Sequence, residues 1–86
     1  MVRGGRKKKL IIAPRLWKML EGDKDFFSNH TFSIRDIFSI YIHQYGPKAI
    51  TINEFAWVLT KPFDKPDSII LHKNRRGRWK FAFQEN

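Results

Sequence analysis

The clearest hydrophobic pattern in the chain lies between Ser33 and Gly46. Ser33 stands where an N-cap residue belongs, and Asp36 occupies the capping-box position three residues later. Apolar side chains then recur three and four positions apart, on one helical face, at Ile34, Ile37, Phe38, Tyr41, Ile42 and Tyr45. Because Gly46 and Pro47 are typical of a helix end, the pattern predicts one helix between these limits.

A second capped helix is predicted shortly after the first. Thr51 and Glu54 repeat the capping box, and Ile50 and Phe55 hold the two positions of a hydrophobic staple. The residues expected to face the core are Ile52, Phe55, Ala56 and Leu59. Pro62 then closes the pattern, so we expect this helix to end near residue 60.

A shorter helix is predicted over residues 14–21. Pro14 suits a first helical turn, where its missing N–H costs nothing, and Gly22 supplies the stop. The apolar residues at helical spacing between them are Leu16, Trp17, Met19 and Leu20.

The segments around that helix lack a helical pattern. Residues 1–9 contain two glycines and five bases, and we expect a disordered basic arm there. The apolar run Leu10–Ile12 is expected to be a strand or an extended lead-in. Residues 22–31 are polar around two phenylalanines, and they are expected to form a loop.

The last quarter of the chain changes to a period of two. Trp79, Phe81 and Phe83 alternate with polar or small residues, as in a strand with one face on a core. The sequence Asn74-Arg-Arg-Gly77 suits a type I turn followed by a left-handed glycine. We therefore expect a hairpin of strands 68–73 and 78–84. The alternative is a helix that starts at Pro66 and ends at Gly77.

These elements define an α+β fold, a three-helix bundle followed by a C-terminal β-hairpin. The length of 86 residues suits a single domain, expected to span residues 10–86 after the arm. The absence of cysteine excludes a disulfide framework and thiolate zinc sites. No apolar run approaches the ~20 residues of a membrane span, and the run after the basic start is too short for a signal peptide. We therefore expect an intracellular protein of the cytoplasm, nucleoid or nucleus.

The net charge of +9 is concentrated at the two ends of the chain. Residues 1–15 carry six bases and no acid, whereas residues 16–60 have a net charge of −1 and residues 61–86 a net charge of +4. Two concentrated basic blocks are typical of proteins that meet a polyanion. The composition therefore favours a nucleic-acid partner.

The order of three helices and a basic-tipped hairpin resembles winged helix-turn-helix DNA-binding domains. The resemblance covers residues 31–84 and rests on SIRDIFSIYIHQYG, the Gly-Pro break, ITINEFAWVL and HKNRRGRWKF. It implies a winged-helix-like fold that binds duplex DNA, with one helix in the major groove and the hairpin as a wing on the backbone or minor groove. The five-residue link GPKAI is longer than the usual joint of three or four residues. If this link precedes the turn motif instead, residues 66–76 would be the groove helix.

Thirteen residues are candidates for contact with nucleic acid. The hairpin supplies Lys73, Arg75, Arg76, Arg78 and Lys80, whose charges would displace condensed counterions from a duplex. The arm supplies Arg3, Arg6, Lys7, Lys8 and Lys9, which would order on contact. The outer face of the second capped helix supplies Asn53, Trp57 and Lys61, with Thr60 beside them. Asparagine can pair with adenine through two hydrogen bonds.

Enzyme chemistry is not expected. His30, His43 and His72 are far apart and follow no metal-binding spacing, and no nucleophile–base pattern is present. We expect a binding module without metal or cofactor, a transcriptional regulator whose partner is double-stranded DNA and not a membrane. A homodimer would be usual for a DNA reader of this size.

Two alternatives remain at the level of the sequence. RNA or ribonucleoprotein binding would fit basic segments beside aromatic residues, and exposed aromatics on a strand would favour it. A protein-interaction role is suggested because LIIAPRLWKMLEG and TFSIRDIFSIYIHQYG are loosely similar to the opening helices of SWIB-type domains. That likeness implies a hydrophobic cleft that takes a partner's helix.

Overall fold

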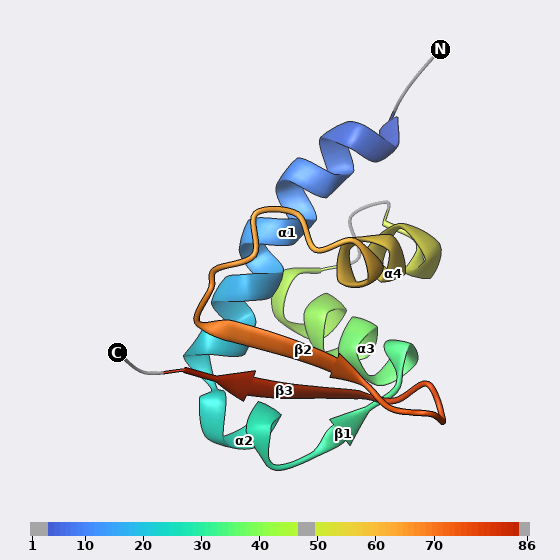
Figure 1. The fold of residues 1–86 in the computed structure, drawn as a ribbon. Helices are drawn as coiled ribbons and strands as arrows, with labels where there is room; N and C mark the ends of the chain where they lie inside the picture. The colour runs from blue at the N-terminus through green and yellow to red at the C-terminus, as the bar shows by residue number, and fades with distance from the viewer. Residues whose placement is uncertain (1–3, 47–49, 85–86) are drawn as a thin grey trace.

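The computed structural model describes residues 4–46 and 50–84, with side chains described from residue 11 onward. The elements follow the order α1 (Gly4–Gly22), α2 (Lys24–Ser28), β1 (Thr31–Phe32), α3 (Ile34–Tyr45), α4 (Ile52–Thr60), β2 (Ile69–Lys73) and β3 (Trp79–Phe83). The strands form one antiparallel sheet in the order β1-β3-β2. In the view of Figure 1, helices α1 and α3 pass behind the sheet and α4 lies above it. The α+β prediction is confirmed.

Both capped helices form where the sequence predicts them. In α3, Ser33 Oγ accepts from the Asp36 backbone N–H at 3.1 Å, and Asp36 Oδ2 accepts from the Ser33 N–H at 3.1 Å. Thr51 and Glu54 make the same reciprocal pair at the start of α4. Gly46 ends α3 with φ +86°, and Pro47 lies outside the described residues.

The two helices pack through aromatic rings. Phe55 of α4 lies 5.3 Å from Phe38 and 5.2 Å from Tyr41 of α3, measured between ring centroids. Phe55 and Leu59 are buried as predicted, whereas Ile52 and Ala56 are half-buried and Val58 joins the core instead.

The hairpin is confirmed, and the alternative helix over residues 66–77 is excluded. β2 pairs with β3 from Ile69 opposite Phe83 to Lys73 opposite Trp79. Asn74 organises the turn, because its Oδ1 accepts the N–H groups of Arg76 at 2.9 Å and Arg78 at 3.0 Å. Gly77 adopts φ +78°, the left-handed conformation for which the sequence places a glycine.

Helix α1 corrects three predictions, because it begins at Gly4 and continues through Pro14 to Gly22. Residues 4–9 are therefore helical rather than a disordered arm, and Leu10–Ile12 is helical rather than extended. Ile12, like Ala13, is fully buried and continues the buried face of the 14–21 helix upstream. Packing on that face outweighs the hydrogen bond lost at Pro14, and lysine and arginine propagate a helix readily.

The loop predicted over residues 22–31 is also corrected. It contains the five-residue helix α2 and the first residue of β1. Phe27 is 2% exposed and packs its ring against Phe32 and Phe81, with centroids 5.4 and 5.9 Å away. Elements this short carry too few residues for a periodic signal, so tertiary packing decides their structure.

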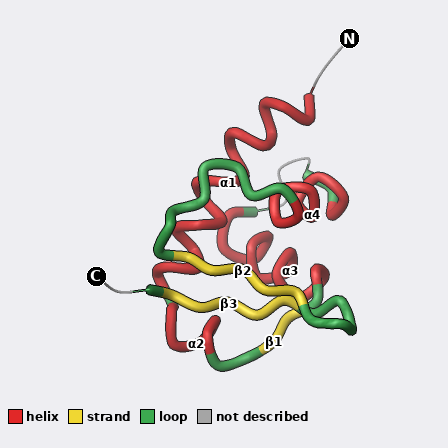
Figure 2. Tube along the Cα trace, viewed as in Figure 1, coloured by secondary structure: helices red, strands yellow, loops and turns green. Residues whose placement is uncertain are grey.

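The segment between α4 and β2 is tied to α1 and to the sheet. Trp17 Nε1 donates to the Phe63 carbonyl at 2.9 Å, and Ser68 Oγ donates to Glu21 Oε2 at 3.0 Å. The Lys65 ammonium donates to the carbonyls of Pro66 and Ile69, at the outer edge of β2. These contacts fix the path of the chain from α4 into the hairpin (Figure 2).

Candidate nucleic-acid interface

The hairpin turn is an exposed basic feature of the molecule. Figure 2 shows the turn as a loop that extends past the ends of β2 and β3. Arg75 and Arg76 are both exposed, and the turn from Asn74 to Gly77 contains no acidic residue. A β-turn closed by backbone and Asn74 side-chain bonds therefore presents two guanidinium groups at its tip.

Arg78 differs from its neighbours because it folds back onto the body. Its Nε donates to Thr31 Oγ1 at 3.0 Å, and its Nη2 donates to the Thr31 carbonyl at 2.8 Å. The same Nη2 lies 3.6 Å from Asp36 Oδ2. The expectation that the hairpin holds all its bases away from the body is therefore corrected at Arg78.

The two lysines of the hairpin lie on opposite faces of the sheet. Lys73 is the cross-strand partner of Trp79, and its Nζ lies 5.8 Å from the centre of that ring. Lys80 points away from the core, between His72 of β2 and Thr31 of β1. One continuous phosphate backbone that meets Arg75 and Arg76 could therefore reach only one of the two lysines by passing along one face of the hairpin.

The outer face of α4 has the composition predicted from the sequence. Asn53, Thr60 and Lys61 are exposed, and Trp57 is 48% exposed. Asn53, Trp57 and Thr60 are spaced four and three positions apart, so they form one stripe along the helix. Glu54 is the acidic residue of α4, and its carboxylate is engaged in the capping box.

The N-terminal candidates fall in a different setting from the one expected. Arg3 lies outside the described residues, and positions 6 to 9, which hold Arg6, Lys7, Lys8 and Lys9, are the first turns of α1. These turns extend beyond the sheet and the other helices at the top of Figure 1. The candidate bases at positions 6 to 9 therefore belong to the start of a helix and not to a disordered arm.

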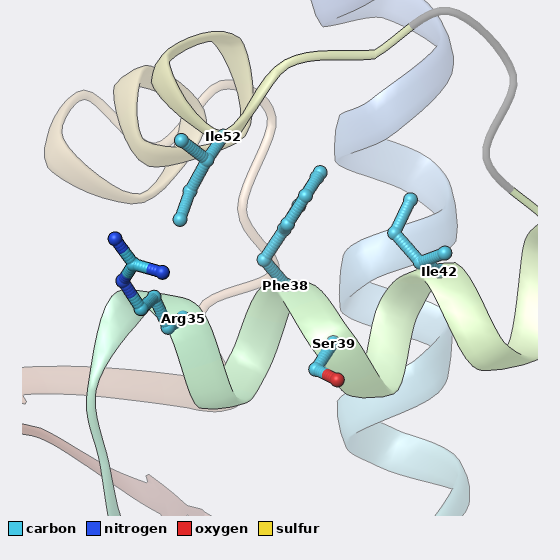
Figure 3. Close-up of a pocket in the computed structure, with 5 residues that line it drawn as sticks. All are labelled: Arg35, Phe38, Ser39, Ile42 and Ile52. Carbon is cyan, nitrogen blue, oxygen red and sulfur yellow. The ribbon is translucent and has the colours of Figure 1, made fainter.

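Arg35 is an exposed base that the sequence analysis did not single out. It lies in the first turn of α3 and, with Phe38, Ser39, Ile42 and Ile52, lines an open groove of about 550 Å³ between α3 and α4. Figure 3 shows its side chain pointing toward Ile52, at the start of α4. Arg35 lies in a segment, residues 16–60, whose net charge is −1, and that sum gives no sign of a single exposed base. Its position beside Asp36 in the first turn of a capped helix is the signal that could have found it.

Two structural observations bear on the alternatives. Trp79 and Phe81 are 6% and 1% exposed, so β3 presents neither ring as a stacking platform for RNA bases. The α3–α4 groove, which bears on the protein-interaction alternative, combines an arginine and a serine with three apolar side chains.

His30 Nδ1 lies 2.9 Å from the Phe26 carbonyl. Within the described part of the chain, no three His, Asp or Glu residues come together as metal ligands would. Across residues 4–46 and 50–84, no helix combines the length and the apolarity of a membrane span.

Comparisons with known proteins add no further assignment. None of the protein-family models, the curated proteins or the solved structures matches this chain. Any assignment of function therefore depends on the fold and on the distribution of charge over its surface.

Proposed function

We propose that this protein binds double-stranded DNA in the manner of a small winged-helix domain and acts in transcriptional regulation. The observation that carries the proposal is the acid-free hairpin turn with Arg75 and Arg76 exposed at its tip. Helices followed by a C-terminal three-stranded antiparallel sheet are compatible with a winged-helix-like arrangement. In this assignment the hairpin is the wing.

Phosphate contacts supply the affinity. Each guanidinium that meets a phosphate releases condensed counterions, which makes binding weaken steeply with salt. Arginine also presents two parallel N–H groups to a phosphate, which a lysine cannot do. Arg75 and Arg76 are therefore assigned to the backbone of the duplex.

Helix α4 is assigned to the major groove. Residues 66–76 belong to the hairpin and not to a groove helix, and α4 exposes the polar stripe that the sequence predicts. Asn53 can bond adenine through two hydrogen bonds, Trp57 offers an apolar surface, and Lys61 at the end of the helix can meet a phosphate. Since phosphate contacts carry no sequence information, any sequence preference arises from this stripe.

The test is a salt titration with duplex DNA, using single-stranded RNA of equal length as the competitor ligand. We expect duplex binding whose logarithm falls linearly with the logarithm of salt concentration. The double variant Arg75→Gln/Arg76→Gln should lower that slope by about 2, because each phosphate that is no longer neutralised changes it by about 0.9. Lys18→Gln/Lys24→Gln removes the same charge from exposed positions on α1 and α2, and it should leave the slope nearly unchanged. Salt-independent binding, tighter binding to RNA, or equal effects of both double variants would overturn the proposal.

A further inference from the structure

Arg78 combines two structural roles that its neighbours in the turn do not share. Its backbone closes the turn, because its carbonyl accepts from the Asn74 N–H at 2.8 Å and its N–H donates to Asn74 Oδ1 at 3.0 Å. Its side chain bonds Thr31 twice and lies 3.6 Å from Asp36. The residue that closes the turn is thus the one that attaches it to β1 and α3.

The partners of Arg78 are themselves held in place. Thr31 pairs with Lys80 in the sheet, and Asp36 Oδ2 accepts the Ser33 N–H that closes the cap of α3. A guanidinium is planar and rigid, so bonds from two of its nitrogens to one residue define its direction. We call the contacts of Arg78 with Thr31 and Asp36 the Arg78 clamp.

The clamp connects the two elements assigned to DNA. Helix α3 packs on α4 through the Phe38–Phe55 ring contact, and the clamp fixes the turn to the first residues of α3. The clamp therefore adds to the strand pairing that sets the position of Arg75 and Arg76 relative to the α4 stripe. Without the clamp, the turn keeps its internal hydrogen bonds but is no longer attached to α3 by a side chain.

We propose that Arg78 is a positioning residue that makes the hairpin select duplex DNA over single strands. This inference rests on the proposed function. A duplex is stiff over ~150 base pairs, so its phosphates are offered at fixed spacing to a site that is fixed in advance. A preorganised site loses little freedom on binding, whereas a single strand can adapt to a turn in any orientation. Loosening the clamp therefore weakens duplex binding selectively.

Two variants test the clamp by different routes. Arg78→Lys keeps the positive charge but cannot make the two-pronged contact, and Thr31→Val removes the Oγ1 acceptor while suiting a strand. We expect each to weaken duplex binding about 5- to 10-fold and single-strand binding less than about twofold. The salt slope should stay at the wild-type value, because the protein still neutralises the same number of phosphates. Thr31→Ser restores the hydroxyl and should recover the duplex preference.

A measurement without nucleic acid separates this inference from the proposed function. In NMR spectra, the Arg78 Nε–H should exchange with water more slowly than that of Arg75 or Arg76, and Thr31→Val should abolish the difference. Equal exchange in all three arginines would overturn the clamp. Duplex binding by Arg78→Lys as tight as that of the wild type would also overturn it. A salt slope lowered by about 1 in Thr31→Val would do the same, since Thr31 offers no charge to a phosphate. If the wild-type protein does not bind duplex DNA, the proposed function is wrong and so is the selectivity assigned to Arg78. This holds even if slow exchange of the Arg78 Nε–H shows that the clamp is intact.

Discussion

The hairpin and the start of α1 are both rich in bases but place them differently along the backbone. Residues 73–80 contain five lysines or arginines, and residues 4–9 at the start of α1 contain four. The hairpin bases are held by strand pairing, by the Asn74 turn and by the Arg78 clamp. Positions 6 to 9 are consecutive on one helix, and successive helical positions are about 100° apart, so they are distributed around its axis.

The comparison of these two regions shows that the number of bases and their arrangement in space have different consequences for binding. A duplex approaching one side of a helix can meet only part of a ring of bases, whereas both arginines of the turn lie at one tip. Long-range attraction depends on the sum of the charges, but the number of phosphates contacted depends on geometry. The first turns of α1 are thus expected to speed encounter more than they hold the complex.

The largest expected effect is a loss of folding stability at the point where α1 begins to pack on the core. Ile12 is fully buried and Ile11 is 49% exposed, so the two neighbours form a matched pair. Ile12→Ala should lower the free energy of unfolding by about 2–4 kcal/mol, because it leaves a cavity in the core. Ile11→Ala should change it by less than about 0.5 kcal/mol. Urea denaturation measures both, and equal losses would show that α1 is not seated as described.

A comparison of affinities tests the two basic regions directly. Deleting residues 1–9 removes five bases, and Arg75→Gln/Arg76→Gln removes two. We expect the double substitution to weaken duplex binding about 10-fold more than the deletion does, since each fixed phosphate contact carries its full counterion release. Fluorescence anisotropy at one low salt concentration decides between them. A larger loss on deletion would move the main contact to α1.

A smaller loss of stability is expected from a substitution at Gly77, the residue of the turn with positive φ. Gly77 has φ +78°, and a Cβ there would meet no atom closer than the Lys73 Cε at 4.0 Å. Gly77→Ala should therefore cost about 1 kcal/mol from backbone conformation alone, without a clash. Thermal unfolding measures this loss. Gly22→Ala is the control, because Gly22 is helical and a Cβ there would have open space.

The smallest effect concerns Tyr41, which lies beside Arg15 under the packed part of α1. Burial raises the pKa of the Tyr41 hydroxyl, and the neighbouring Arg15 guanidinium partly offsets that rise. The folded-state pKa of Tyr41 exceeds the unfolded value of 10.0. The contribution of this hydroxyl to the free energy of unfolding is therefore fully present below pH 10, and it is lost as the pH rises through the folded-state pKa. Tyr41→Phe should flatten this part of the stability profile, and a profile identical to wild type above pH 10 would contradict it.

Prediction from sequence succeeded where local signals were redundant. Helices α3 and α4 each carry a reciprocal capping box and a clear stop, and the hairpin combines alternation with a glycine at the one position of the turn that needs positive φ. These signals act within a few residues of each other, so the sequence alone places them.

Prediction failed where long-range packing decides the structure. Pro14 suggested a helix start, but the buried Ile12 and Ala13 extend the helix past it. Phe27 and Phe32 give α2 and β1 their structure only through contact with one another and with the sheet. The fold-back of Arg78 depends on Thr31, which is 47 positions away, and no local pattern announces that contact.

The Lys65 side chain also bears on how copies of this protein behave toward one another. An edge strand that offers unpaired carbonyls is a template for a neighbouring chain. At β2 the Ile69 carbonyl already accepts a bond from an ammonium group, so another strand would have to displace or bury that charge in order to add there. The position of Lys65 therefore disfavours the addition of a further strand at the start of β2.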